Sequence, residues 1–452
     1  MTRIESVHAR EVFDSRGKPT VEVEITCAGS RLPGRAIVPS GASTGKLEAR
    51  ELRDGDPQRF AGQGVLRAVA NVNGPIADAL RGLDVDDQQR IDATLCELDG
   101  TADKSRLGAN ALLGASLAAA YAAAQAQGVL LVEHLHALWR RVPANIPARA
   151  RRAGAAPGLG DGLILPLPMV NMISGGLHAG DNLDFQDFLM IASGAASLRQ
   201  SLEWAIAVYR ELGSILRRDG YEGVLVGDEG GYGPRLASNR DALRYLIDAV
   251  EGVGLKPGKD VHLALDVASS HFYADGVYRL ADKPASPLHS DEMVALLAEW
   301  VDSYPIISIE DGVAEDDWPG WKQLTNRLGS RVQLIGDDLF VTQTERIAQG
   351  IESGVANSVL IKLNQVGTLS ETFAAIRTTL DASYWPVISA RSGETEDATI
   401  ADLAVATGAG QIKIGSVARS ERLAKYNQLL RLEEMLQGRA VWMGGAVFAG
   451  LG

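Results

Sequence analysis

Alternation of apolar and polar residues over positions 4–27 predicts the first elements of the chain, a pair of β-strands. The stretch PTVEVEITC at 19–27 alternates strictly, which is typical of a strand with one buried face. The polar segment from Asp14 to Gly17 precedes it and predicts a turn. The residue pattern of positions 60–95 and 107–127 predicts helices. The second stretch is alanine-rich, which predicts a helix whose small side chains allow close packing.

After position 163 the pattern changes to short apolar segments that alternate with longer mixed ones. Six segments are predicted strands: 261–267, 306–311, 332–338, 358–365, 386–392 and 411–416. Segments such as 290–303, 342–353, 367–380 and 396–407 lie between them and are predicted helices. This alternation predicts parallel strands, and their number favours a closed α/β barrel over an open sheet.

Between these two regions, positions 140–162 are rich in Pro, Gly, Ala and Arg and show no period, which predicts a linker or a mobile basic loop. We therefore expect three parts in the chain. The first is an N-terminal α+β domain over 1–139, the second is the linker over 140–162, and the third is the barrel over 163–452.

Composition narrows the classes of function. The chain of 452 residues carries a net charge of −13 at pH 7, which argues against nucleic acid or an anionic membrane as the main partner. Cys27 and Cys96 are the two cysteines, so no disulfide framework is expected. The N-terminal segment lacks the apolar core of a secretion signal, and the alanine-rich run 118–126 is too weakly hydrophobic to span a membrane. We expect a cytoplasmic protein.

Acidic residues stand at the ends of three successive predicted strands. Asp266, Glu310 and Asp337 can point inward around one centre at the C-terminal rim of a barrel. Three oxygen ligands without a cysteine or a neighbouring histidine suit Mg²⁺ rather than Zn²⁺. A single such residue is more often a surface or capping residue, but three in register on adjacent strands favour a metal site.

Basic residues occupy other strand ends. Lys362 is flanked by apolar residues in LIKLNQ, which predicts a lowered pKa and a candidate general base. The alternative is an ion-pair partner of the metal carboxylates, and both roles can hold. Lys413 in QIKIGS adds a second buried cation opposite the acidic cluster. Arg391 and Ser392 follow another strand and form a natural grip for phosphate or carboxylate.

Nearly the whole chain resembles the enolase family. The segments that carry the resemblance are AREVFDSRGKPTVEVE, VPSGASTG, GGLHAGDN, VGDEGGYGP, LALDVASSHFY, SIEDGVAEDDW, GDDLFVT, LIKLNQVGTLSET, RSGETEDATIADLAVATGAGQIK and AKYNQLLRLEE, in family order. The resemblance implies an N-terminal α+β domain that caps a modified α/β barrel, usually in a homodimer. It also implies Mg²⁺ as cofactor and a small phosphorylated carboxylic acid as substrate.

The resemblance implies roles for individual residues. The family's metal ligands match Asp266, Glu310 and Asp337, and Ser43 matches the serine that ligates a second Mg²⁺, which arrives with substrate. Lys362 matches the base that removes the proton α to the carboxylate. The remaining matches are Lys413 near the substrate carboxylate, Arg391 and Ser392 at the phosphate, Gln186 and the loop histidine His178 in the substrate site, and Glu229 as the second carboxylate at the leaving group.

The sequence departs from the family pattern at the leaving-group side. Ala390 stands where the family has histidine, and Asp187 stands where it has glutamate, which retracts the carboxylate by about 1.5 Å. His271 replaces a glutamate of the SSEFY pattern, and the 140–162 insertion is longer than usual. The residues matched to proton abstraction, metal and phosphate are all retained.

Two changes at one end of the substrate favour respecialisation. One offshoot of the family, carboxyphosphonoenolpyruvate synthase of phosphinate natural-product pathways, fits this pattern, because a pocket without the imidazole admits a larger, phosphonylated reactant. Two alternatives stay open. The first is an ordinary phosphopyruvate hydratase, which converts 2-phosphoglycerate to phosphoenolpyruvate. The second is a non-catalytic scaffold, against which the retained lysine and acidic residues argue.

Overall fold

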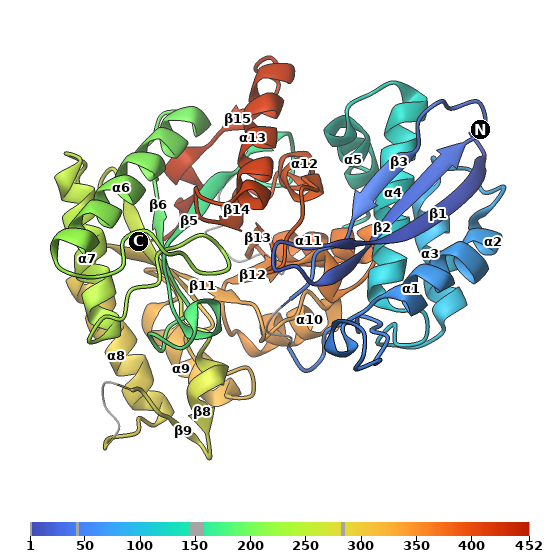
Figure 1. Cartoon of the computed structure of the whole chain (residues 1–452). Helices are drawn as coiled ribbons and strands as arrows, with labels where there is room; N and C mark the ends of the chain where they lie inside the picture. The colour runs from blue at the N-terminus through green and yellow to red at the C-terminus, as the bar shows by residue number, and fades with distance from the viewer. Residues whose placement is uncertain (1, 42–44, 145–157, 282–284, 452) are drawn as a thin grey trace.

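The computed structural model describes residues 2–41, 45–144, 158–281 and 285–451 and shows two lobes side by side (Figure 1). The N-terminal lobe is an antiparallel three-stranded sheet packed against helices. The C-terminal lobe is a closed eight-stranded barrel surrounded by helices. The predicted architecture, an α+β domain beside a modified α/β barrel, is therefore confirmed.

The sheet of the N-terminal lobe follows the alternating pattern of its sequence. Its strands are β1 (Ile4–Phe13), β2 (Pro19–Cys27) and β3 (Gly34–Ile37), in the order β1-β2-β3. The predicted turn closes through a hydrogen bond of 2.9 Å from Gly17 N to Asp14 O. Helix α4 (Ala109–Gln127) packs on β2 and β3 so closely that a Cβ at Gly34 would lie 2.2 Å from Ala122 N. The small residues of the helix make this contact possible.

The helical prediction for 60–95 is wrong in part, because the segment is broken. It forms η1 (Phe60–Gly62), α1 (Leu66–Asn71), the π-helical turn η2 (Val72–Ile76), α2 (Ala77–Leu80) and, after a loop, α3 (Gln88–Asp99). Pro75 lies inside η2 and has no N–H to donate, which interrupts the α-helical hydrogen bonds. Asp87 caps α3 by accepting a hydrogen bond from Arg90 N. Helix α5 (Leu131–Trp139) completes the lobe.

The barrel contains the six predicted strands and two that the sequence pattern did not reveal. Its order is β10-β11-β12-β13-β14-β5-β6-β7. The bounds are β5 (Leu167–Ser174), β6 (Asp187–Ile191), β7 (His262–Asp266), β10 (Ile306–Glu310), β11 (Gln333–Gly336), β12 (Ser358–Ile361), β13 (Trp385–Ser389) and β14 (Gln411–Gly415). Short strands outside the barrel are β4 (Ile164–Leu165) with β15 (Val441–Trp442), and β8 (Tyr273–Ala274) with β9 (Val277–Tyr278).

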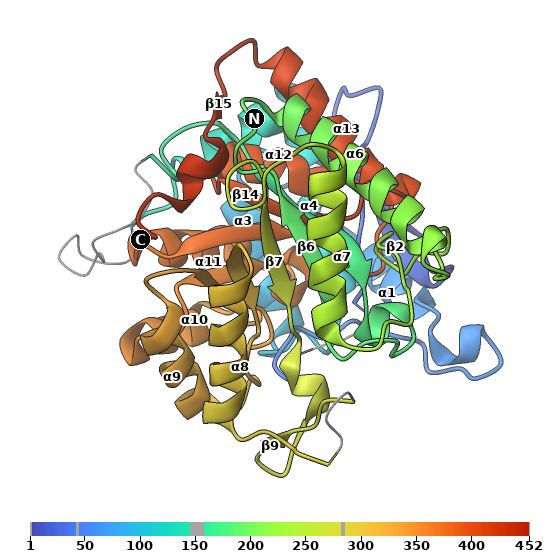
Figure 2. The ribbon, with the colours of Figure 1, turned by 90° about the vertical axis from the view of Figure 1, so that its left-hand side faces the viewer.

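Helices surround the barrel. They are α6 (Leu198–Arg218), α7 (Asn239–Gly252), α8 (Ser290–Ser303), α9 (Trp318–Leu328), α10 (Thr344–Ser353), α11 (Leu369–Asp381), α12 (Thr399–Thr407) and α13 (Ser420–Met435). Short helical turns are η4 (Gly176–Ala179), η5 (Ser269–Phe272), η6 (Leu363–Gln365) and η7 (Gly444–Phe448). In Figure 2, α6 and α7 flank β6 and β7 on one side, and α8, α9 and α10 lie on the other.

Strand β6 runs antiparallel to both neighbours, which corrects the expectation of an all-parallel barrel. The segment between β5 and β6 holds only the short turn η4, whereas a parallel return needs a long crossover connection. The reversal places the first residue of β6, Asp187, opposite Ser174 and Asp266, the last residues of β5 and β7. Asp187 thereby joins the rim that carries the other charged strand ends.

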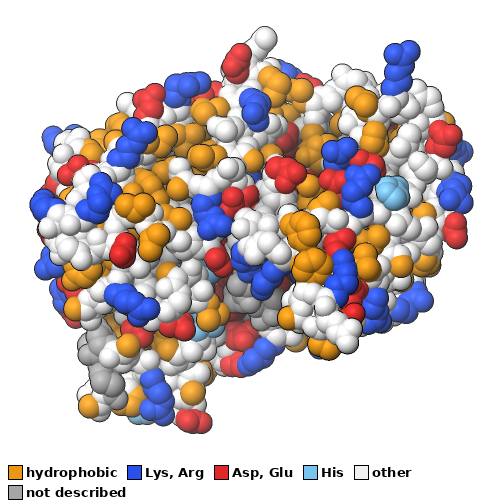
Figure 3. Space-filling model, in the orientation of Figure 1, with side chains coloured by type: hydrophobic (Ala, Val, Ile, Leu, Met, Phe, Trp, Pro, Cys, Tyr) orange, Lys and Arg blue, Asp and Glu red, His pale blue; other side chains and the backbone are white. Residues whose placement is uncertain are grey.

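The two lobes are joined by backbone as well as side chains. Ser40 N donates to Gly393 O at 2.8 Å, and Gly393 N donates to Ser40 O at 2.9 Å. A Cβ at position 393 would lie 2.4 Å from Asp14 Oδ2, so this close approach requires glycine. On the face drawn in Figure 3, charged side chains of both signs gather where the lobes meet.

Of the predicted linker 140–162, positions 145–157 lie outside the described residues. Its C-terminal part is held by both lobes, because Trp139 Nε1 donates to Gly160 O at 2.9 Å and Gly160 N donates to Gly408 O at 3.0 Å. Within the described ranges, no single helix is long and apolar enough to cross a membrane. Helices α4 and α5 meet the length and composition criterion only as a pair, which is bent by 108°.

Candidate active site

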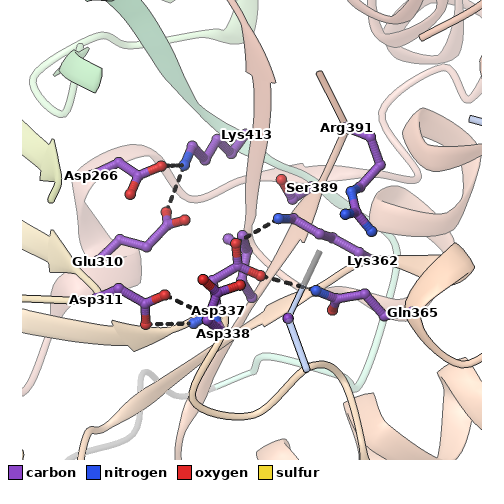
Figure 4. Close-up of polar contacts among 12 residues, drawn as sticks. Asp266, Glu310, Asp311, Asp337, Asp338, Lys362, Gln365, Ser389, Arg391 and Lys413 are labelled. Atoms are coloured by element: carbon purple, nitrogen blue, oxygen red, sulfur yellow. Dashed lines mark hydrogen bonds and ion pairs between the residues drawn. The ribbon is translucent and has the colours of Figure 1, made fainter. Parts of the chain in front are cut away.

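Two lysines and three carboxylates from adjacent barrel strands meet at the C-terminal rim (Figure 4). Lys413 Nζ, on β14, donates at 2.7 Å to Asp266 Oδ2 and at 2.7 Å to Glu310 Oε2. Lys362 Nζ, just after β12, donates at 2.5 Å to Asp337 Oδ2. The sequence-based grouping of these five residues around one centre therefore matches the geometry.

The prediction of a lowered pKa for Lys362 is wrong. Burial by itself lowers the pKa of this ammonium group, but the adjacent Asp337 carboxylate outweighs burial and raises it. The same balance, with Asp266 and Glu310 as partners, raises the pKa of Lys413 well above its usual value. Apolar neighbours in the sequence indicated the burial of Lys362, but they could not indicate its ion pair.

Asp311 positions the backbone that carries Asp337. Its Oδ1 accepts a hydrogen bond of 3.0 Å from Asp337 N, and its Oδ2 accepts one of 2.8 Å from Asp338 N. Asp311 itself has a positive φ of 41°, a strained conformation for a residue with a Cβ. Sequence reasoning missed this residue, although it directly follows Glu310 in SIED.

The donor set fits the Mg²⁺ that the sequence predicts. Asp266, Glu310 and Asp337 are at most 8% exposed and offer carboxylate oxygens from adjacent strands. Glu310 Oε1 is buried and has no hydrogen-bond partner among the described residues, and burial together with Asp266 raises the pKa of Glu310. A buried, unpartnered carboxylate oxygen beside two further carboxylates suits a hard divalent cation.

The three carboxylates do not converge as tightly as two other groups of the described residues. His178, Asp187 and Glu229 form one group whose candidate ligand atoms lie within 4.8 Å of each other, and Asp311, Asp337 and Asp338 form another. The ammonium groups explain the looser triad, because Lys413 bridges Asp266 to Glu310 while Lys362 holds Asp337. Both lysines therefore occupy carboxylate oxygens that are candidate ligands of the cation.

A second cluster, on β5, η4 and β6, faces the leaving-group side that the sequence predicts. His178 Nδ1 lies 3.2 Å from Asp187 Oδ2, and the amide of Asn171 donates to Asp187 Oδ1. Asp187 is fully buried, and both of its oxygens are engaged in this way. Asp187 therefore acts on the pocket through His178.

The electrostatics of this cluster keep the histidine protonated. Burial alone lowers the pKa of His178, but the Asp187 and Glu229 carboxylates raise it to about 9. Burial raises the pKa of Asp187 to about 6, and the charge of His178 opposes that rise. At neutral pH the imidazolium can donate a proton, which is what a departing hydroxide needs.

The predicted phosphate grip lies at the junction of the lobes. The guanidinium of Arg391 is 3% exposed and forms hydrogen bonds with Glu48 and Asn364. Ser392 Oγ accepts a hydrogen bond of 3.1 Å from Arg16 NH1, which comes from the turn between β1 and β2. Sequence reasoning missed Glu48, Asn364 and Arg16, because their partners lie far away in the chain.

One pocket brings most of the predicted residues together. It is lined by His178, Gln186, Glu229, Asp266, Lys362, Ser389, Ala390, Arg391, Ser392 and Lys413. Ala390 forms part of its wall at the point where the family pattern has an imidazole. Gln186 Nε2 donates to Asp266 Oδ2 at 3.1 Å, which joins the two sides of the pocket.

Two further predicted positions lie elsewhere. Ser43 lies outside the described residues. His271 lies on η5 after β7, and burial lowers the pKa of its imidazole although the charges of Asp266 and Asp181 oppose that shift. The backbone N–H of His271 donates to Ala268 O at 3.1 Å.

Comparison with known families covers both lobes. Residues 4–135 match the family described as enolase, N-terminal domain, and residues 162–450 match enolase, C-terminal TIM barrel domain. Together the two matches span nearly the whole chain and coincide with the two lobes of the structure. The chain therefore belongs to the enolase family.

Proposed function

We propose that this protein is a Mg²⁺-dependent enzyme that removes the proton α to the carboxylate of a small phosphorylated or phosphonylated acid. The observation that carries the proposal is the pocket in which Lys362, Lys413, Arg391 and the acidic strand ends face one another. A substrate of this kind matches those charges, because guanidinium and hydroxyl groups bind phosphoryl oxygens and a lysine pairs with a carboxylate.

In this proposal each residue acts at a defined atom of the substrate. Arg391 and Ser392 bind the phosphoryl or phosphonyl oxygens, and Lys413 lies near the carboxylate. Lys362 accepts the α-proton, which requires that it first lose its ion pair with Asp337, because that carboxylate raises the pKa of its ammonium group while burial alone lowers it. Asp266, Glu310 and Asp337 would hold Mg²⁺, with Ser43 as a ligand of a second ion that arrives with substrate. When bound, Mg²⁺ supplies positive charge opposite the charge that proton removal creates.

The leaving-group side supports a specialised role. His178, supported by Asp187 and Glu229, is a proton donor on this side, whereas position 390 contributes only a methyl group to the wall. A methyl group where the family pattern has an imidazole favours a larger phosphorus reactant than 2-phosphoglycerate. We therefore propose carboxyphosphonoenolpyruvate synthase activity in phosphonate or phosphinate biosynthesis. The alternative is an ordinary phosphopyruvate hydratase, which is supported by the retained residues for proton abstraction, metal binding and phosphate binding.

Two assays separate these candidates. A screen of phosphonate substrates by phosphorus NMR should show a new product with Mg²⁺ present. A coupled absorbance assay on 2-phosphoglycerate should show slow formation of phosphoenolpyruvate. Dehydration at an ordinary enolase rate would contradict the specialised role and leave the hydratase. The homodimer and the cytoplasmic location stay predictions. Sedimentation at micromolar concentration tests the homodimer.

Replacing Asp337 by asparagine should weaken Mg²⁺ binding on the order of 100-fold. Loss of a hydrogen-bond partner behind a metal ligand already weakens metal binding by about 10- to 100-fold, and loss of the ligand's own charge should cost at least as much. The substitution keeps the hydrogen bond from Gln365 but removes the charge that a hard cation needs. Isothermal calorimetry measures the effect. Asp302→Asn is the matched control, since this carboxylate is exposed and pairs with Arg331. Unchanged binding in Asp337→Asn would mean that other residues hold the metal.

The pH dependence of elimination should report on His178. Because the Asp187 and Glu229 carboxylates raise its pKa from 6.5 to about 9, the proton is present at neutral pH and is lost as pH rises through about 9. In Asp187→Asn the alkaline limit should move toward the usual value of about 6.5. The measurement is the pH profile of 2-phosphoglycerate elimination in both proteins. An unchanged limit would exclude His178 as the proton donor.

A further inference from the structure

A carboxylate from the N-terminal lobe holds the guanidinium of the phosphate grip. Arg391 NH1 lies 2.9 Å from Glu48 Oε2, and Arg391 NH2 lies 3.2 Å from Glu48 Oε1, which is a two-pronged ion pair. Both side chains are buried, with 3% and 6% of their surfaces exposed. Arg391 NH1 also donates to Asn364 Oδ1 at 2.9 Å. At least three of the five N–H donors of the guanidinium are thus directed at protein partners.

A single amide connects this ion pair to the metal carboxylates. Gln365 Nε2 donates at 3.2 Å to Glu48 Oε1 and at 3.1 Å to Asp337 Oδ1. Its Oε1 accepts a hydrogen bond of 2.6 Å from Thr342 Oγ1, which fixes the orientation of the amide. Gln365 is completely buried. Figure 4 shows its amide pointing at Asp337, below the ammonium group of Lys362 in this view.

These contacts form a closed ring at the rim. Asn364 and Gln365 are neighbours on η6, Asn364 accepts from Arg391, Gln365 donates to Glu48, and Glu48 accepts from Arg391. The backbone supports the ring, because Ala49 N donates to Gln365 O at 2.9 Å. Glu48 is the member of the ring that comes from the N-terminal lobe, so the ring is complete only when the lobes are docked.

We propose that Glu48 and Gln365 are positioning residues. Glu48 fixes the guanidinium of Arg391 in the direction that a phosphoryl or phosphonyl group requires, and Gln365 holds that arrangement in register with Asp337. This inference rests on the proposed function, since it assigns Arg391 to the phosphorus group of the substrate.

The charge of Glu48 gives the proposal a distinctive signature. A carboxylate beside Arg391 repels a second anion, so it weakens the attraction of the guanidinium for phosphate. The same carboxylate orients the planar fork, and loss of orientation by about 1 Å can lower a rate on the order of 100-fold. Removing the charge should therefore improve simple anion binding and impair chemistry. Loss of a merely structural contact would impair both.

The test compares the wild type with Glu48→Gln in Mg²⁺ buffer. Calorimetry with inorganic phosphate measures anion binding, and exchange of the α-proton of 2-phosphoglycerate in deuterated solvent measures chemistry. In Glu48→Gln, phosphate should bind about 10-fold more tightly. Exchange should fall about 100-fold. Weaker phosphate binding together with slower exchange, or no change in either, would overturn the proposal.

A second variant separates charge from position. Glu48→Asp keeps the charge but retracts it by one methylene, so phosphate affinity should stay within about twofold while exchange still falls. Glu48→Asp also keeps a negative charge beside the buried guanidinium of Arg391, so it remains a usable test if Glu48→Gln does not fold. Gln365→Met, which removes the three hydrogen bonds of the side-chain amide at similar volume, should slow exchange as well. The double variant Glu48→Gln with Gln365→Met should lose less than the product of the single losses, because both act in one ring. Independent, fully multiplicative losses would contradict the link between Gln365 and Glu48.

Asp316→Asn is the matched control. Its carboxylate forms an ion pair with Lys46, from the same segment of the N-terminal lobe, but both partners are exposed and stand outside the ring. Neither measurement should change in this variant. The two measurements, phosphate binding and proton exchange, also separate this inference from the proposed function. Absence of exchange in the wild type would contradict the proposed function alone, because phosphate binding tests the contact between Glu48 and Arg391 without any chemistry.

Discussion

Replacing Ala390 by histidine and Asp187 by glutamate in one variant should raise the dehydration of 2-phosphoglycerate about 100- to 10,000-fold, the usual contribution of a positioned acid. Proton abstraction needs the base, the metal ligands and the phosphate grip, all of which this chain keeps. Expulsion of hydroxide also needs donors at the leaving group, where Ala390 contributes none. The measurement is steady-state formation of phosphoenolpyruvate by both proteins.

The control for this variant is Ala390→Leu, which fills the space beside the pocket without adding a donor. It should not raise dehydration, whereas turnover of a larger native substrate should fall in both variants. A double variant without any gain would break the link between these two positions and the reaction. The same conclusion would follow if the wild type already dehydrated 2-phosphoglycerate at an ordinary enolase rate.

Replacing Lys362 by methionine should lower exchange of the α-proton of 2-phosphoglycerate with deuterated solvent by about 100- to 10,000-fold, because the base is removed at nearly constant volume. Proton NMR of the substrate follows the exchange directly and does not depend on the leaving group. Lys104→Met is a matched control, since Lys104 is also buried and pairs with a carboxylate, Glu371, at 2.7 Å. Its loss should lower stability without changing exchange.

Exchange at the wild-type rate in Lys362→Met would exclude Lys362 as the base. Lys413 would then be the remaining candidate, because it lies among the same carboxylates. Circular dichroism of both lysine variants should match the wild type, which ensures that the comparison concerns chemistry. A variant that loses exchange together with its folded structure would call for Lys362→Arg as the replacement.

The sequence predicted the rim because strand direction determines where strand ends meet. Asp266, Glu310 and Asp337 follow apolar segments with parallel connections, so their side chains had to gather at one edge of the barrel. The same logic could not place Asp187, which begins a strand. It lies at the rim because β6 is reversed, and that reversal depends on the length of a connection rather than on alternation.

Ion pairs and hydrogen bonds between residues far apart in the sequence could not be predicted from the pattern of apolar and polar residues. Lys362 was predicted to be buried, and its side chain is 12% exposed, but the direction of its pKa shift depends on Asp337, 25 residues away. Asp311 could not be recognised as a positioning residue, because its contacts reach the next strand. Local periodicity reports whether a side chain is buried, but it does not report which charge faces it.

The separation of 343 positions between Glu48 and Arg391 also matters during synthesis. At about 5–20 residues per second, roughly 20–70 s pass between the appearance of the two side chains. The N-terminal segment is made first, so Glu48 has no partner from position 391 during this interval. The ion pair can form only after β13 leaves the ribosome, so docking of the lobes is a late step that finishes the active site once nearly the whole chain has been made.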